Sequence, residues 1–128
     1  MKIKIIVLER IESVAFLYHD EFEELGHKVI LLNQGEKLLE TIKKEYPQVL
    51  ILGIKIAGFG PFDLLEEVRA AYPKLPIIFN TSALEFWEGA NAKGADFYNA
   101  KTSDLTNLKE IIEKIAKNCQ EPPSKKGG

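Results

Sequence analysis

Short apolar runs alternate with longer amphipathic stretches along this chain. The apolar runs cover residues 3–8, 28–32, 49–52, 76–79 and 95–99. Runs of this length between helical stretches predict buried strands. A strand that is followed by a long crossover and then another strand predicts parallel pairing, with helices on both faces of the sheet. The pattern therefore predicts an α/β domain with five parallel strands.

Five such units match the flavodoxin-like, doubly wound arrangement, with the strand order 2-1-3-4-5. In this arrangement the ligand crevice lies at the carboxyl ends of strands one and three, where the order reverses. The residues at those ends are Leu8, Glu9 and Gly53. They are the first candidates for a functional site.

The helical stretches carry apolar residues at helical spacing and have recognisable start signals. In the first helix we expect the inner face to hold Val14, Leu17, Tyr18, Phe22 and Leu25. Expected helix starts are Asn33 with Glu36 as a capping box, Gly60-Pro61, Ser82 with Glu85, and Ser103. In the last helix Leu105, Leu108, Ile111, Ile112 and Ile115 are expected to face the core.

Composition narrows the class of protein. The chain has 128 residues, is 45% hydrophobic and carries a net charge of −2. This fits one domain, which we place at residues 1–119, followed by a disordered tail or linker stub at 120–128. The charge gives no reason to expect nucleic acid as a partner. One cysteine, no long apolar run and no signal-peptide pattern predict a cytoplasmic protein without a membrane span.

The segment Pro47-Gln48-Val49-Leu50-Ile51-Leu52-Gly53-Ile54-Lys55-Ile56-Ala57-Gly58 resembles the third strand and following loop of a two-component response-regulator receiver domain. The resemblance extends over residues 3–117. It implies a phosphorylation pocket built from Leu8, Glu9, Gly53, Lys55, Thr81 and Lys101. Thr81 and Lys101 match the hydroxyl and the lysine that bind phosphoryl oxygens in this family.

The remaining pocket positions depart from the family pattern. Gly53 stands where the family has the aspartate that accepts the phosphoryl group, and Leu8 replaces one residue of the metal-binding acidic pair. Glu9 keeps a carboxylate, which we expect at the surface edge, paired with Lys101 or Arg10. We therefore predict a pseudo-receiver with no catalytic residue, no specific metal, no cofactor and no enzymatic activity.

The resemblance also implies a surface for protein contacts. Tyr98 occupies the position of the family's aromatic switch residue. Phe86 is expected to face the core, which leaves the adjacent Trp87 partly exposed on the surface of the fourth helix, fifth strand and fifth helix. The expected partner is a signalling protein or a second copy of the chain. A flat packing of Trp87 on its own domain and a fixed Tyr98 remain the alternatives.

Two other functions remain open from the sequence. The first is residual phosphoryl or metal binding through Glu9, Thr81 and Lys101, with Glu9 or Asp63 as the nearest acids. The second is a flavodoxin-like binder of small molecules in the crevice, although no phosphate-binding or flavin-stacking motif supports it.

Overall fold

A computed structural model describes residues 2–53, 55–82 and 86–119. Its five-stranded sheet has the order β2-β1-β3-β4-β5, and every pairing is parallel. The strands are β1 (Lys4–Leu8), β2 (Lys28–Leu32), β3 (Val49–Gly53), β4 (Ile77–Thr81) and β5 (Phe97–Ala100). This is the topology predicted from the sequence.

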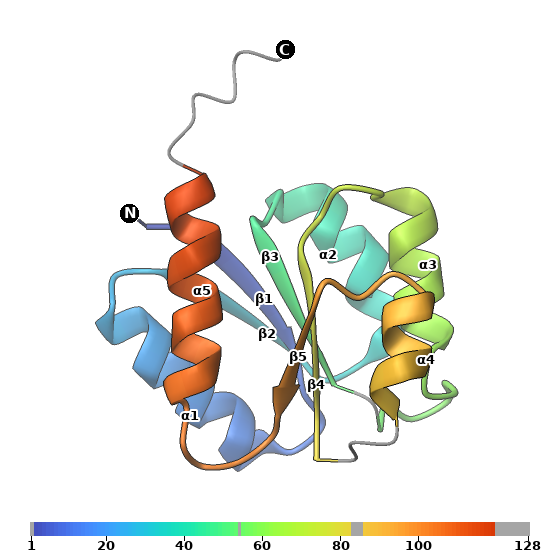
Figure 1. The fold of residues 1–128 in the computed structure, drawn as a ribbon, viewed down its shortest axis with the longest axis horizontal. Coiled ribbons are helices and arrows are strands. Elements are labelled where there is room, and N and C mark those ends of the chain that lie inside the picture. Colours follow the sequence, from blue (N-terminus) through green and yellow to red (C-terminus); the bar gives the residue numbers. More distant parts are fainter. Residues whose placement is uncertain (1, 54, 83–85, 120–128) are drawn as a thin grey trace, which may run out of the picture.

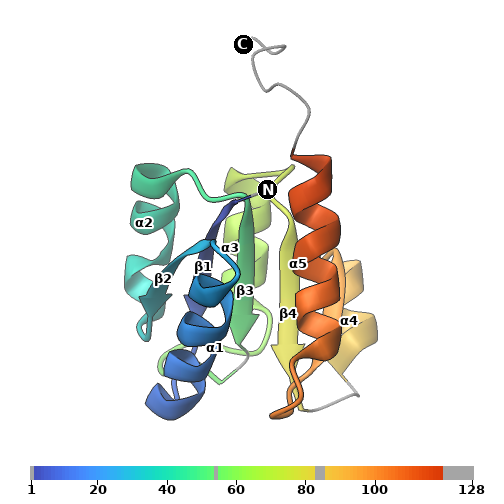
Figure 2. The ribbon, with the colours of Figure 1, turned by 90° about the vertical axis from the view of Figure 1, so that its left-hand side faces the viewer.

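Helices cover both faces of the sheet (Figures 1 and 2). On one face lie α1 (Glu12–Glu24) and α5 (Thr106–Asn118). On the other lie α2 (Leu38–Glu45), α3 (Asp63–Ala71) and α4 (Trp87–Ala92). A short 3₁₀ turn, η1 (Gly35–Lys37), precedes α2. Among the described helices, none combines the length and apolar character needed to cross a bilayer.

Each face of the sheet has its own apolar core. In β1, Ile5 and Val7 belong to the core under α1 and α5, whereas Ile6 and Leu8 belong to the other core. Successive strand residues point to opposite faces, and here both faces are covered. This explains why the strands read as continuous apolar runs.

Three helices begin later than predicted. Asn33 does not cap α2, because residues 35–37 first form the 3₁₀ turn. The third helix begins at Asp63, whose carboxylate accepts a hydrogen bond from the Gly60 N–H at 2.7 Å. The fifth begins at Thr106, whose N–H donates to the Asp104 carboxylate at 3.0 Å. The start expected at Ser82 with Glu85 involves residues outside the described part of the chain.

The inner face of α1 is narrower than predicted. Tyr18 and Phe22 are fully buried, but Leu17 and Leu25 are 37% and 48% exposed. Leu17 precedes Tyr18 by one residue, so its side chain points in a different direction around the helix. Leu25 lies beyond the last turn of the helix. The core contact of α1 is completed instead by Ala15.

His27 is a buried histidine next to the sheet. Its Nδ1 accepts a hydrogen bond from the Ile3 N–H at 3.1 Å, and the residue is 2% exposed. Burial lowers the pKa of His27 below its usual 6.5, against a smaller opposing effect of Glu113. The ring is therefore neutral in the folded protein at pH 7.

The lowered pKa of His27 predicts a loss of stability in mild acid. The unfolded chain takes up the proton on His27 more readily than the folded protein does. The contribution of neutral His27 to the free energy of unfolding is therefore complete above about pH 6.5, and it decreases as the pH drops further. Urea unfolding between about pH 5 and about pH 8 checks this. His27→Gln should flatten the dependence, and His19→Gln, at a half-exposed ring, is the control. Equal slopes for wild type and His27→Gln would contradict the assignment.

Candidate functional site

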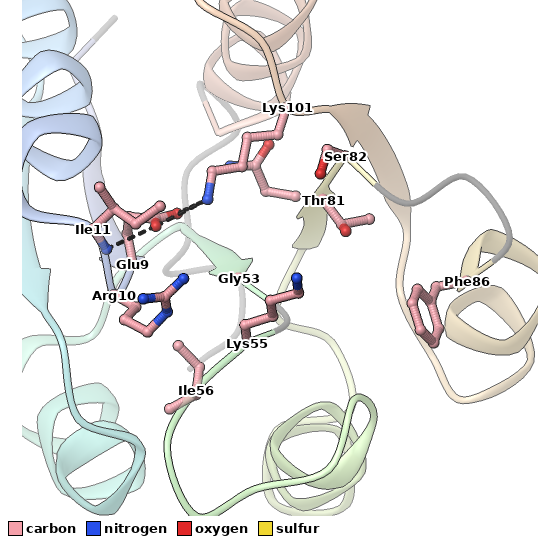
Figure 3. A pocket seen from close by; sticks show the side chains of 11 residues that line it. Glu9, Arg10, Ile11, Gly53, Lys55, Ile56, Thr81, Ser82, Phe86 and Lys101 are labelled. Carbon is pink, nitrogen blue, oxygen red and sulfur yellow. Dashed lines mark hydrogen bonds and ion pairs between the residues drawn. The ribbon is translucent and has the colours of Figure 1, made fainter.

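A polar pocket of about 160 Å³ lies at the carboxyl ends of the strands (Figure 3). Parallel strands bring their carboxyl ends to one edge of the sheet, so residues distant in sequence meet there. The pocket is lined by Glu9, Arg10, Ile11, Gly53, Lys55, Ile56, Asn80, Thr81, Ser82, Phe86 and Lys101. Five of the six predicted pocket residues are therefore together.

The exception is Leu8, which does not line the pocket. It is 1% exposed and packs in the core beneath α2, α3 and α4. As the last residue of β1, it points to the same face of the sheet as Ile6. Leu8 thus contributes to stability and not to the pocket.

Glu9 and Lys101 form an ion pair across the pocket. The Lys101 Nζ lies 2.9 Å from both carboxylate oxygens of Glu9, and the Ile11 N–H donates to Oε2 at 3.0 Å. This is one of the two pairings predicted for Glu9. The predicted surface position was wrong, since Glu9 is only 3% exposed. Its carboxylate turns back over the start of α1 and is covered there.

Gly53 ends β3 beside this ion pair. A Cβ atom added at Gly53 would lie 2.9 Å from the Leu8 carbonyl oxygen and 3.6 Å from Glu9 Oε1. The first distance is shorter than real Cβ contacts, and a backbone atom has little freedom to move away. The local geometry of β1 and β3 is therefore fitted to glycine.

Arg10 and Lys55 add two further cations to the pocket. Both side chains are exposed to solvent, in contrast to Glu9. Within the described part of the chain, neither forms an ion pair or a hydrogen bond. The described residues of the pocket thus supply three cationic side chains and one carboxylate, a balance that favours anions.

Tyr98 and Trp87 lie next to each other at one side of the site. Their ring centroids are 5.4 Å apart, and both residues are half-buried against the core of their own domain. The Tyr98 hydroxyl donates to the Thr81 carbonyl at 3.4 Å. Phe86 is also half-buried and meets Phe62 edge to face, which agrees with its predicted inward direction.

A row of polar side chains, buried except for its outer member Asn107, leads away from the pocket and was not predicted from the sequence. Asn107 Nδ2 donates to Asn99 Oδ1 at 2.8 Å, and Asn99 Nδ2 donates to Asn80 Oδ1 at 2.7 Å. Asn80 Nδ2 donates to the Tyr18 hydroxyl at 2.9 Å. Burial raises the pKa of Tyr18, against a smaller opposing effect of the Asn80 hydrogen bond. The sequence carries one signal for this row, which is an asparagine near the end of each of two adjacent strands.

Comparison with known proteins finds similar sequences and similar structures. No protein-family model matches the chain. Sporulation initiation phosphotransferase F of Bacillus subtilis is 22% identical over 116 residues, covering 89% of this chain and 94% of that protein. Regulatory protein LuxO of Vibrio vulnificus is 29% identical over 76 residues, covering 59% of this chain and 17% of LuxO.

The crystal structure of the response regulator TrrA from Thermotoga maritima, in complex with Mg²⁺ and BeF, matches with a TM-score of 0.82. The sequences are 24% identical, and the match covers 90% of this chain and 99% of TrrA. The chain therefore has the receiver fold, and its sequence resembles those of response-regulator proteins. The match covers less than a fifth of the length of LuxO.

The receiver family implies a divalent cation in this pocket, but the residues present do not fit one. Within the described residues, no group of three or more histidine, cysteine or acidic side chains could hold a metal. Among the described residues that line the pocket, Glu9 is the one carboxylate, and Lys101 already neutralises it. A divalent cation would also meet Arg10 and Lys55. Since magnesium prefers several oxygen ligands, this donor set is unsuitable.

Proposed function

We propose that this receiver domain takes part in two-component signalling without being phosphorylated on aspartate, and that it acts through protein contacts. The observation that carries the proposal is Gly53 at the carboxyl end of β3, beside the Glu9–Lys101 pair. Glycine offers no nucleophile there, and Glu9 is occupied by Lys101 and by the Ile11 N–H. The pocket therefore supports neither phosphoryl transfer to residue 53 nor the metal that such a transfer needs.

Treatment with acetyl phosphate and Mg²⁺ tests the chemical half of the proposal. We expect the intact mass of the wild-type protein to stay unchanged, because among the described pocket residues the one carboxylate, Glu9, is already paired with Lys101. A receiver domain that has the aspartate is the positive control. A hydroxylamine-sensitive phosphoryl adduct on the wild type would contradict the proposal, and its loss in Glu9→Gln would identify Glu9 as the acceptor.

The contact half of the proposal concerns the surface formed by α4, β5 and α5. Trp87 and Tyr98 lie together on α4 and β5, and both remain half-exposed. Tryptophan and tyrosine are enriched among the residues that dominate binding energy. With the phosphorylation route absent, this pair supports docking of a signalling protein or of a second copy of the chain.

Substitution of Trp87 tests this surface. Trp87→Ala is expected to weaken partner binding by at least about tenfold, the effect of losing a strong interface residue. Tyr46→Ala is the matched control, because Tyr46 is 79% exposed and lies at the end of α2, a helix that does not belong to this surface. Sedimentation analysis detects self-association, and quantitative affinity capture with each variant detects other partners. Equal binding by wild type and Trp87→Ala would exclude Trp87 from the interface.

A further inference from the structure

A second hollow adjoins the polar pocket and differs from it in character. It measures about 450 Å³ and is lined mainly by apolar side chains. The two spaces share Arg10, Lys55, Ile56 and Phe86, so they are neighbouring parts of one depression. The apolar part is completed by Ala57, Phe59 and Pro61. A polar compartment thus opens beside a larger apolar one.

The two unpaired cations stand at the boundary between these compartments. Arg10 and Lys55 line both spaces, and Figure 3 shows their side chains reaching into the region beside the Glu9–Lys101 pair. Lys101 contacts both oxygens of Glu9, so the carboxylate does little to offset the charge of Arg10 and Lys55. A guanidinium and an ammonium at one boundary suit an oxyanion, because both donate charge-assisted hydrogen bonds.

The two spaces differ in volume, and each suits a different part of a ligand. The polar pocket, at about 160 Å³, is smaller than the roughly 300–1,000 Å³ typical of small-molecule sites, whereas the adjoining hollow lies within that range. An oxyanion group fits the charge and size of the first. An aromatic or aliphatic group fits the lining of the second, where Phe59, Pro61 and Phe86 offer apolar contacts.

We propose that this depression binds a small organic phosphate non-covalently. Its phosphate group lies between Arg10 and Lys55, and its apolar body lies against Phe59, Pro61 and Phe86. No bond to the protein forms, and no metal takes part. Neither Trp87 nor Tyr98 lines this ligand site, so this proposal and the proposed protein contacts can fail separately.

Phenyl phosphate is a direct probe of the proposal. In NMR titrations of the wild-type protein we expect saturable shifts at residues of both compartments, including Arg10, Lys55 and Phe59. Phenol and inorganic phosphate, which each carry half of the ligand, should bind at least about tenfold more weakly. Added salt should weaken the binding of phenyl phosphate, because the recognition is ionic.

Charge-removing variants locate the site. Lys55→Gln and Arg10→Gln should each weaken phenyl phosphate binding by about tenfold, the effect of one charge-assisted hydrogen bond. Lys44→Gln, at an exposed lysine on α2, is the matched control and should bind like wild type. Thermal melting confirms that the variants are folded. The proposal is overturned by absence of saturable binding, by equal binding of inorganic phosphate, or by equal losses in Lys44→Gln and Lys55→Gln.

Discussion

Replacing Lys101 with methionine is expected to lower the free energy of unfolding by about 3 kcal/mol. The substitution keeps the length of the side chain but leaves the carboxylate of Glu9 without its cation, at a position only 3% exposed. Breaking a buried pair from one side costs about 3–5 kcal/mol. We expect the lower end of this range because Lys101 is itself 23% exposed. Urea unfolding at neutral pH measures the loss.

A second ion pair of the same chemistry provides the control for Lys101. Lys109 on α5 pairs with Glu21 on α1, and both side chains are about one-third exposed. Lys109→Met should therefore cost less than about 1 kcal/mol. Combining Glu9→Gln with Lys101→Met should recover most of the stability, since no buried charge remains. If Lys101→Met and Lys109→Met cost the same, the Glu9–Lys101 pair is not energetically buried.

Substitution of Asn99 with alanine is expected to cost about 2–3 kcal/mol of folding free energy. Asn99 is 2% exposed and is the central link of the polar row, so its removal leaves the Asn80 oxygen without its donor. An unpaired buried polar group costs about 1–3 kcal/mol, and the lost side chain also leaves a small cavity. Chemical denaturation measures the change.

The outer end of the row supplies the comparison for Asn99. Asn107 is exposed at the start of α5, where water can replace its contacts. Asn107→Ala should cost less than about 1 kcal/mol of folding free energy. Its removal opens the Asn99 oxygen to water, which can replace the lost hydrogen bond. If Asn107→Ala costs as much stability as Asn99→Ala, burial does not determine how much each hydrogen bond of the row contributes.

The fold was predictable because its signal is spread over many residues. Each strand is buried on both faces, so each appears as an apolar run, and the crossover rules then restrict the topology. Helix starts were less predictable because they depend on single hydrogen bonds. Asn33 and Glu36 have the composition of a capping box, yet the chain there forms a 3₁₀ turn. Nothing in the local sequence distinguishes a capping box from this 3₁₀ turn.

The site was predictable where it depends on strand ends and unpredictable where it depends on side-chain direction. Gly53, Thr81 and Lys101 meet at one edge because their strands are parallel. Leu8 was wrongly assigned to the pocket, because as a β1 residue it points to the same face as Ile6. The burial of Glu9 was not predictable, since it depends on the turn after β1. The row from Asn107 to Tyr18 depends on the register of β4 and β5, which pairs Asn80 with Asn99.

The polar row has a direction as well as a position. From Asn107 through Asn99 and Asn80 to Tyr18, each amide gives its hydrogen to the next residue inward. The central amide, Asn99, cannot turn over alone, because reversal would set its nitrogen against the Asn107 nitrogen and its oxygen against the Asn80 oxygen. The two strands and the two helices on that face are consequently held in one mutual alignment, and sliding any of them would disrupt the whole sequence of bonds.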